Sequence, residues 1–262
     1  FRTQFNQMEN IEKQVLMESL AARYNMTFLD LHTFDRWGQS STTGIFEKDG
    51  RKFVFVPGDT VTLGWEQFAV GLNQESREEL EYLFREWEME PQNPEEMIRE
   101  SMAPVRQAAI GPMLVGRELE ELCWESVKMD DPRLTAHPDW LKEFRDFAWS
   151  DSSSLTLHQS ARIERTEDGF HTWIYHCTDY DALLAGLEKQ GLSLPTADEW
   201  AYLCGGGCRT LFPWGDGLDY SMRLRWFEDM DEDENRPYDM EEPNFFGLSI
   251  AYDPYMREVV QA

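Results

Sequence analysis

Cys204 and Cys208 enclose three glycines and are the residues of this sequence best suited to do chemistry. Two thiolates at this spacing could supply half of a zinc site, which His176 and Cys177 would complete, because zinc prefers sulfur and nitrogen ligands. They could instead form a redox-active pair, although two intervening residues is the usual spacing for such pairs. In a third interpretation both are small, half-buried residues beside a glycine turn. The sequence leaves the three interpretations open.

A second candidate is an acidic run in which oxygen-bearing side chains alternate along the chain, as at the start of a calcium-binding EF-hand loop. The candidate ligands are Asp229, Asp231, Asp233 and Asn235. An EF-hand needs glycine at its sixth position and a bidentate glutamate at its twelfth, which here are Glu234 and Met240. The run therefore predicts either a looser calcium site or a solvated acidic loop.

A third candidate is a ligand pocket built from residues in the last quarter of the chain. Its predicted lining is Trp214, Asp216, Phe245 and Phe246. Aromatic side chains at such positions can equally form the core of the fold. Glu199 lies three residues after Thr196, so we expect it to cap a helix rather than to act as a general base.

Composition limits the classes of partner. The 262 residues are 41% hydrophobic and 13% aromatic, which is typical of a folded protein, and the formal net charge is −26. Such a charge repels phosphate backbones and disfavours binding to nucleic acid. No apolar run is long enough to cross a bilayer, so no membrane association is expected. Four cysteines in a chain of this length do not form a disulfide framework, which predicts a reduced, cytoplasmic protein.

The sequence predicts several of the helices and turns that must position these residues. Thr196 and Glu199 form a capping box at the start of a short helix, which three glycines end. Before it, Asp179–Lys189 has apolar residues at helical spacing. Ile45–Val56 predicts a hairpin around the Asp49–Gly50 step.

Further helices are expected elsewhere. In the expected helix Asn10–Arg23, the apolar side consists of Ile11, Val15 and Leu16. A second expected helix starts with a capping box formed by Ser76 and Glu79, and its apolar face extends to Trp87. The expected helical segments are Asn10–Arg23, the segment from Ser76 to Trp87, a short helix capped by Asn93 with Pro94 in its first turn, Arg117–Val127, and Pro138–Trp149. Leu155–Cys177 is expected to be β-rich with a turn at Asp168–Gly169, and Gly215–Asn244 to form long loops.

The run Gln190–Gly217, QGLSLPTADEWAYLCGGGCRTLFPWGDG, resembles the core motif of the formylglycine-generating-enzyme family, the sulfatase-modifying-factor domain. FVFVPGDTVTLG at Phe53–Gly64 and PNFFGL at Pro243–Leu248 resemble flanking motifs of the same family, in the same order. The resemblance implies an α+β, C-type-lectin-related domain with a small twisted sheet and extensive loops. We expect a helical extension over residues 1–44, then the domain over 45–262, with a helical insertion at about 72–130.

The resemblance also implies what chemistry to look for. Oxidase members of the family bind copper through a cysteine pair beyond a GNVWEW motif, but here the matching stretch is Asp253–Val259 and the sequence ends at Ala262. Related sulfoxide synthases bind iron through three histidines, and the five histidines of this chain lack that spacing. Neither copper nor iron is therefore expected, whereas calcium is compatible with the family.

These observations predict a catalytically silent member of the family that serves as a scaffold for an unknown protein or small-molecule ligand, with the acidic loops as its binding surface. One alternative is an oxygen- or thiol-dependent oxidoreductase whose cysteines or metal ligands lie beyond residue 262. Another is an acidic decoy for a basic partner.

Overall fold

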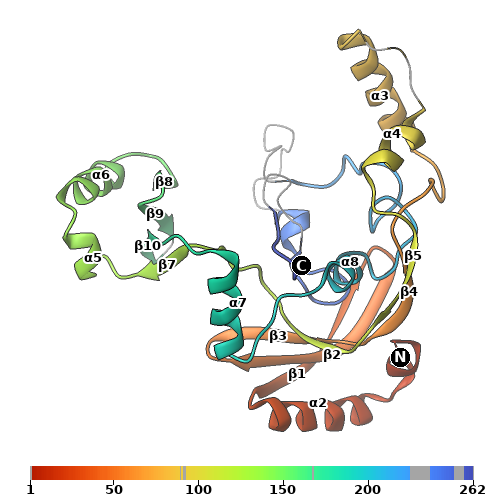
Figure 1. Ribbon diagram of the computed structural model, residues 1–262, viewed down its shortest axis with the longest axis horizontal. Helices are drawn as coiled ribbons and strands as arrows, with labels where there is room; N and C mark the ends of the chain where they lie inside the picture. Colours follow the sequence, from red (N-terminus) through yellow and green to blue (C-terminus); the bar gives the residue numbers. More distant parts are fainter. Residues whose placement is uncertain are drawn as a thin grey trace. The chain divides into compact units, whose positions relative to one another are not determined.

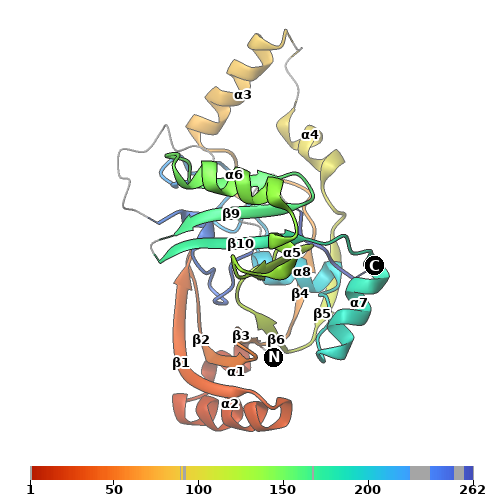
Figure 2. The same cartoon turned by 90° about the vertical axis from the view of Figure 1, so that its left-hand side faces the viewer.

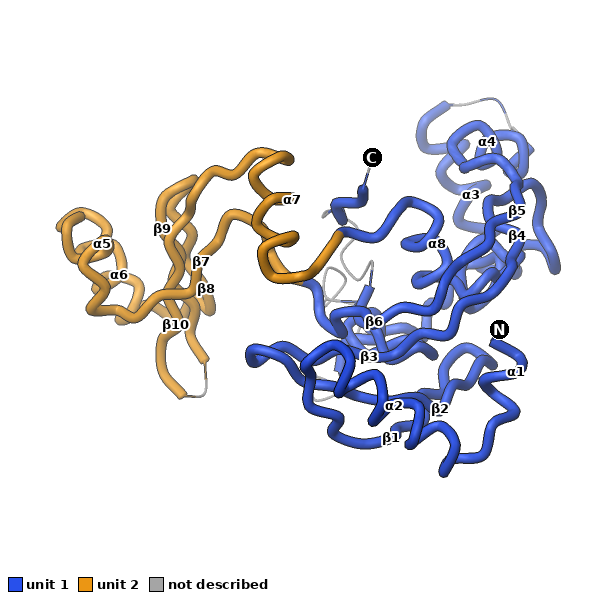
Figure 3. The backbone as a smooth tube through the Cα atoms, turned by 60° about the horizontal axis from the view of Figure 1, so that its bottom comes forward, with its two compact units in different colours: residues 1–119, 194–262 blue, residues 120–193 orange. Residues whose placement is uncertain are grey.

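The computed structural model describes residues 2–88, 90, 93–166, 168–224, 237–250 and 257–261. Within these residues the fold is mixed α+β with antiparallel sheets, as the sequence predicts. The chain divides into two compact units, which are coloured separately in Figure 3. Unit 1 contains Phe1–Leu119 and Leu194–Ala262, and unit 2 contains Glu120–Ser193. None of the described helices is long and apolar enough to cross a membrane.

A four-stranded antiparallel sheet with the order β1-β2-β3-β6 is the framework of unit 1 (Figure 1). Its strands are β1 (Thr27–Arg36), β2 (Gln39–Lys48), β3 (Arg51–Val56) and β6 (Met113–Gly116). Two-residue turns join β1 to β2 and β2 to β3, and the second turn is the predicted Asp49–Gly50 step, where both residues have positive φ. The hairpin over Ile45–Val56 is therefore confirmed, although β2 starts earlier, at Gln39.

Two helices precede this sheet, α1 (Arg2–Gln7) and α2 (Asn10–Tyr24), and α2 packs along β1 and β2. The predicted helix is present, but its buried side is Lys13, Met17 and Ala21, whereas Ile11 and Val15 are 78% and 62% exposed. Gly44 of β2 makes this packing possible, because a Cβ there would lie 2.6 Å from the Met17 side chain.

Two further strands and two helices follow in unit 1. Strands β4 (Asp59–Leu63) and β5 (Arg106–Ile110) form a two-stranded antiparallel sheet, and the helices α3 (Gln74–Glu86) and α4 (Pro94–Ser101) lie between them in sequence. Asn93 caps α4 as predicted. The capping box at Ser76 is wrong, because Asn73 caps α3 by accepting a hydrogen bond from the Ser76 amide. Trp87 also lies outside the helix and is 70% exposed.

The core of unit 1 lies where α8 (Ala197–Gly205) meets β4 and β5 and the segment Asn244–Leu248. The Thr196–Glu199 capping box is confirmed, since each side chain accepts a hydrogen bond from the other residue's backbone amide. Tyr202 is fully buried, and its hydroxyl donates to the Pro57 carbonyl at 2.8 Å. After the glycines the chain turns between Phe212 and Gly215, and the Phe212 and Trp214 rings are stacked 4.9 Å apart.

Unit 2 has a core and a sheet of its own. Its antiparallel strands, in the spatial order β7-β10-β9-β8, are β7 (Trp124–Val127), β10 (Gly169–Tyr175), β9 (Ala161–Thr166) and β8 (Ser154–Leu157). Its helices are α5 (Pro132–Thr135), α6 (Pro138–Ala148) and α7 (Tyr180–Lys189). Figure 2 shows α6 along the sheet, where Phe144 and Phe147 pack on Ala161 and Ile163.

In unit 2 the β-rich segment and the helices at Pro138 and Tyr180 are confirmed. The turn between β9 and β10 comes earlier than the predicted Asp168–Gly169 step, because Gly169 already pairs with Thr166. A helix over Arg117–Val127 is wrong, because Trp124–Val127 pairs with Thr172–Tyr175 as strand β7. This pairing across about fifty residues in sequence overrides a locally helical pattern.

The domain boundaries also differ from the predicted ones. The expected helical extension over residues 1–44 contains all of β1 and the first part of β2, and its predicted end, residue 44, pairs with Leu31 inside the sheet. The expected insertion at about 72–130 is helical only over α3 and α4, since β5, β6 and β7 occupy its second half. A single domain was expected, whereas the contacts divide the chain into two units.

Candidate functional site

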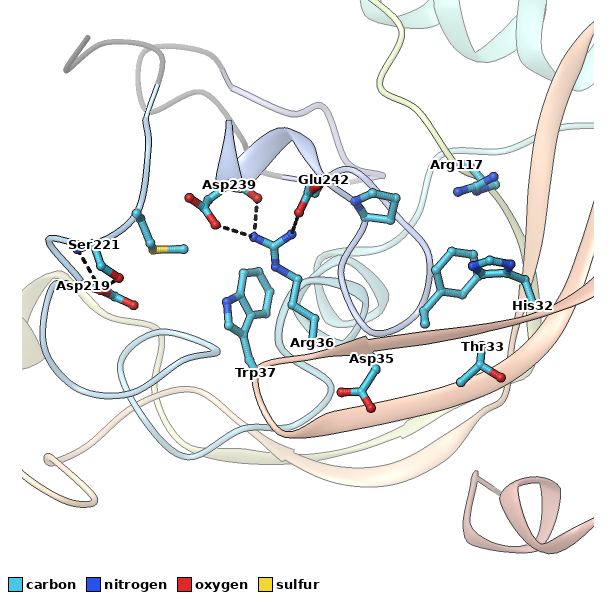
Figure 4. A pocket seen from close by; sticks show the side chains of 13 residues that line it. His32, Thr33, Asp35, Arg36, Trp37, Arg117, Asp219, Ser221, Asp239 and Glu242 are labelled. Carbon is cyan, nitrogen blue, oxygen red and sulfur yellow. Dashed lines mark hydrogen bonds and ion pairs between the residues drawn. The ribbon is translucent and has the colours of Figure 1, made fainter. Parts of the chain in front are cut away.

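A groove of about 630 Å³ lies beside strand β1 in unit 1 (Figure 4). A volume of this size is usual for ligand sites, which hold roughly 300–1,000 Å³. Six consecutive residues from the end of β1 and the turn after it form one wall. Arg117, which directly follows β6, and residues from segments near the C-terminus form the rest. These residues are His32–Trp37, Arg117, Asp219, Ser221, Met222, Asp239, Glu242 and Pro243.

Arg36 is the best-anchored charge of the groove. Its guanidinium lies 3.1 Å from a Glu242 carboxylate oxygen and 3.3 Å from an Asp239 carboxylate oxygen. It also donates to the Asp239 backbone carbonyl and lies over the Trp37 ring, 4.8 Å from its centroid. The Arg36 side chain is only 12% exposed, so water screens its charge less than it would at the surface. Its two ion pairs, to Asp239 and Glu242, hold the segment around Asp239 against β1.

Arg117 provides a second positive charge, at the other end of the groove from Asp219 (Figure 4). Its Nε donates to the Gly247 carbonyl at 3.1 Å, and its guanidinium lies 5.2 Å from the centroid of the Phe34 ring. His32 lies beside the same ring, at 4.6 Å between centroids. No carboxylate of the described residues forms an ion pair with Arg117. This end of the groove can therefore attract an anionic group.

The remaining side chains make the groove acidic as a whole. The groove is lined by the acidic residues Asp219, Asp239 and Glu242 and by two arginines, Arg36 and Arg117. Asp35 also borders it, but its carboxylate points to the other side of β1 (Figure 4). Asp239 and Glu242 neutralise Arg36, whereas Asp35 and Asp219 are exposed and have no ion pair among the described residues. Asp219 accepts hydrogen bonds from the Ser221 amide and hydroxyl. The end of the groove at Asp219 thus favours a cation.

Trp37 supplies the apolar surface at the turn between β1 and β2. Trp37 and Gly38 have φ values of 52° and 71°, the pattern of a type I′ hairpin turn. The Trp37 ring packs 5.4 Å from Trp214 and 6.5 Å from Phe245, centroid to centroid. The turn therefore holds an aromatic side chain between the groove and the core.

The structure places the predicted ligand-binding residues elsewhere. Phe245 and Phe246 are 0% and 1% exposed and belong to the core, so neither presents surface to a ligand. Asp216 is 1% exposed, and its carboxylate accepts hydrogen bonds from the backbone amides of Val70, Gly71 and Leu211 at 2.7–3.0 Å. These three residues are thus structural. Only Trp214 approaches the groove, through its contact with Trp37.

Cys204 and Cys208 are free thiols in a half-buried setting at the end of α8. Burial, followed by the nearby Glu258 and Cys208 charges, raises the pKa of the Cys204 thiol to about 12. Burial also raises the pKa of Cys208 above its ordinary value. Both thiols therefore stay protonated at neutral pH, which weakens them as nucleophiles and as metal ligands. The described residues contain no group of three or more potential metal-ligating side chains.

This difference in thiol chemistry can be measured. At pH 8 we expect iodoacetamide to modify the exposed Cys177 at least tenfold faster than Cys204, because a thiol with a pKa of about 12 is about one part in ten thousand thiolate at that pH. The Cys204 rate should rise about tenfold for each pH unit up to pH 10. Mass spectrometry of tryptic peptides measures both rates in one sample. Equal rates at pH 8 would contradict the buried environment of Cys204.

The predicted calcium ligands Asp229, Asp231, Asp233 and Asn235 lie outside the described residues, as does most of the stretch Asp253–Val259. In contrast, sequence reasoning missed the groove itself. His32, Arg36 and Trp37 lie in a segment that was assigned to a helical extension. Thr27–Arg36 shows no sustained alternation of polar and apolar residues, so the sequence offered no clear signal for this strand.

The described residues thus form a mixed α+β fold with a mainly polar groove beside strand β1. Searches against protein-family models, curated proteins and solved structures found no match for this chain.

Proposed function

We propose that this chain is a catalytically silent binding scaffold and that the groove beside β1 is its binding site. The observation that carries the proposal is the composition of the groove wall. It combines an anchored guanidinium, an aromatic ring and the Asp219 carboxylate, which has no ion pair among the described residues, in one cavity of about 630 Å³. A mainly preformed site with few, fixed polar groups is typical of ligand recognition.

The proposal includes a fold like that of the formylglycine-generating enzymes, related to C-type lectins. Its support is the sequence motif around α8, whose capping box, glycine end and aromatic turn all have structural roles. Loops on such a scaffold are the usual place for binding residues. The groove accords with that expectation, because its far wall consists of residues from the segments that follow α8, namely Asp219, Ser221, Met222, Asp239, Glu242 and Pro243.

A nucleophilic or redox role of Cys204 and Cys208 has less support. Burial raises the pKa of both thiols, and neither residue lines the groove. A reactive cysteine needs an environment that lowers its pKa. We therefore prefer binding over thiol chemistry at this site.

Replacing Trp37 tests the proposal. Trp37→Asn removes the ring yet keeps the turn, because Asn-Gly is a favoured type I′ sequence. We expect ligands that are retained by the wild type to bind at least about tenfold more weakly to this variant, since buried aromatic anchors dominate binding energy. The probe is a mixture of random 12-residue peptides, amino acids, sugars and nucleotides, and affinity selection with mass spectrometry measures retention.

Trp149→Asn is the matched control, because Trp149 is 93% exposed and belongs to unit 2. It should retain the same components as the wild type. The proposal fails when no component that the wild type retains is lost selectively from the Trp37 variant.

A further inference from the structure

Unit 2 contains a cavity of its own, of about 350 Å³, beside helix α6. Leu141, Arg145 and Ala148 of α6 line this cavity, the α6 pocket, at a spacing that places them along one side of the helix. Ile163 of β9 and Phe170 of β10 line it from the sheet, along which α6 runs in Figure 2. Every residue that lines the α6 pocket belongs to unit 2, so the pocket shares none with the groove of unit 1.

The lining of the α6 pocket is apolar apart from one charged residue. Seven of its eight residues have apolar side chains, and the eighth is Arg145. Met129 and Phe170 are 40% and 39% exposed, so apolar surface reaches the mouth of the pocket. A volume of about 350 Å³ has room for roughly twelve non-hydrogen atoms, if each takes about the 30 Å³ of a water molecule. The lining therefore favours a small ligand with an apolar body, whose burial the hydrophobic effect drives.

The Arg145 guanidinium is held beside this apolar surface. Its Nε donates to the carbonyl of Leu141, one turn earlier on the helix, at 3.3 Å, and Leu141 lines the same pocket. This bond lays the guanidinium along the rim of the pocket, where its other N–H groups can reach an acceptor. No carboxylate of the described residues forms an ion pair with Arg145. Glu143 and Asp146 lie on other sides of α6, because residues one or two positions apart do not face each other on a helix.

Arg165 adds a second guanidinium next to the α6 pocket. It lies 5.1 Å from the centroid of the Phe170 ring and donates to the Ala148 carbonyl at 3.4 Å, and both of these residues line the pocket. The whole chain carries a formal net charge of −26, but charges separated by more than about 8 Å are largely screened at physiological ionic strength. The two arginines therefore act on a bound ligand more strongly than distant carboxylates do.

We propose that the α6 pocket binds a small amphipathic carboxylate, whose apolar body lies between α6 and the sheet and whose carboxylate pairs with Arg145. A carboxylate can accept two parallel hydrogen bonds from a guanidinium, and these charge-assisted bonds are stronger than neutral ones. An alcohol of the same size lacks the charge, and an ammonium group is repelled. The pocket belongs to unit 2, so this proposal does not depend on the proposed function of the groove.

A comparison of three ligands on the wild-type protein tests the charge. The probes are octanoate, 1-octanol and octylammonium, which share one straight alkyl chain and are used below their micelle concentrations. We expect octanoate to bind with a Kd of about 1 mM or lower, which a ligand of about ten non-hydrogen atoms reaches at the usual affinity per atom. The other two should bind at least about fivefold more weakly, because neither can form the charge-assisted pair with Arg145.

Methyl NMR titration measures these affinities and locates the ligand. The methyl signals of Met129, Leu141 and Ile163 should shift and saturate with octanoate, whereas that of Ile110 in the core of unit 1 should not. Absence of saturable shifts at the three pocket residues up to millimolar octanoate would overturn the proposal. Equal binding of all three ligands would also overturn it, because the pocket would then select apolar chains without regard to charge.

Arg145→Gln and Lys142→Gln form a matched pair of variants. Both remove one positive charge from an exposed position of α6, but Lys142 does not line the pocket. We expect Arg145→Gln to bind octanoate at least about fivefold more weakly and 1-octanol within about twofold of the wild type. Lys142→Gln should bind both ligands within about twofold of the wild type. An equal loss of octanoate binding in both variants would assign the effect to the overall charge and contradict the proposal.

Ala148→Leu tests where the apolar body lies. Ala148 lines the α6 pocket, so a leucine side chain at this position occupies part of the volume that the ligand needs. We expect octanoate and 1-octanol both to bind at least about tenfold more weakly to this variant. Unchanged binding of octanoate would contradict the proposed position of the ligand. If the variant does not fold, the comparison of ligands on the wild type and the Arg145→Gln result decide the question.

Discussion

Replacing Phe246 by alanine is expected to lower the free energy of unfolding of unit 1 by about 3–5 kcal/mol, the usual cost of truncating a buried phenylalanine. Phe246 is 1% exposed, and its ring lies 5.2 Å from Tyr202 and 4.7 Å from Phe245 between centroids. The Arg2 guanidinium covers it at 4.7 Å from the centroid. The substitution leaves a cavity between α8 and the Asn244–Leu248 segment, whose surroundings can collapse only partly because both are anchored by hydrogen bonds.

Urea unfolding followed by residue-resolved hydrogen exchange measures this effect. The separate cores provide the control, because Phe144 is equally buried but belongs to unit 2. We expect Phe246→Ala to reduce protection of amides in α8 and β4 and to leave β9 unchanged, and Phe144→Ala to do the reverse. A loss of less than 1 kcal/mol in unit 1 would contradict the position of Phe246 in the core.

Asp216→Ala is expected to destabilise unit 1 by about 3–5 kcal/mol, comparable to breaking a buried charged network. The carboxylate accepts three backbone hydrogen bonds, with Val70 and Gly71 on one oxygen and Leu211 on the other. Alanine leaves these three amides without their acceptor in a site that is 1% exposed. The connection between the loop before α3 and the turn after α8 would then open.

Asp216→Asn sharpens this test because it preserves the shape of the side chain. One of its two terminal atoms becomes an NH₂ group, which faces N–H donors whichever way the amide is turned. We therefore expect a loss of at least about 2 kcal/mol from this variant, with faster hydrogen exchange at Val70 and Gly71 or at Leu211. Asp35→Ala is the control, since Asp35 is exposed, and its stability should change by less than about 0.5 kcal/mol. If Asp216→Asn were as stable as the wild type, the three amides would not depend on the carboxylate.

The same carboxylate illustrates how a site was misjudged from sequence. Asp216 follows a Phe-Pro-Trp-Gly turn in an acidic region, which suggested a ligand-facing loop. Its partners Val70 and Gly71 are about 145 residues away in the chain. The sequence around Asp216 does not specify that the amides of Val70 and Gly71 meet the amide of Leu211 at this carboxylate.

Local chemistry determined the parts that the sequence predicted well. The Thr196–Glu199 capping box, the Asp49–Gly50 turn, the Asn93–Pro94 helix start and the helices at Pro138 and Tyr180 each depend on residues within four positions of one another. Caps and turns satisfy backbone groups with neighbouring side chains, so their signals survive in a single sequence. The mixed α+β class follows from these elements and is observed.

Only the tertiary structure decided the sheet edge, the second unit and the groove. Trp124–Val127 became a strand because β10 pairs with it, and Thr27–Arg36 became an edge strand because β2 folds back on it. The groove joins β1 to loops about 200 residues further along the chain, and Arg36 bridges them through Asp239 and Glu242. By itself, the sequence determined which short segments could form helix caps, turns and helices. Which segments meet depends on the free energy of burying and pairing groups that are distant in the chain, and no local pattern records it.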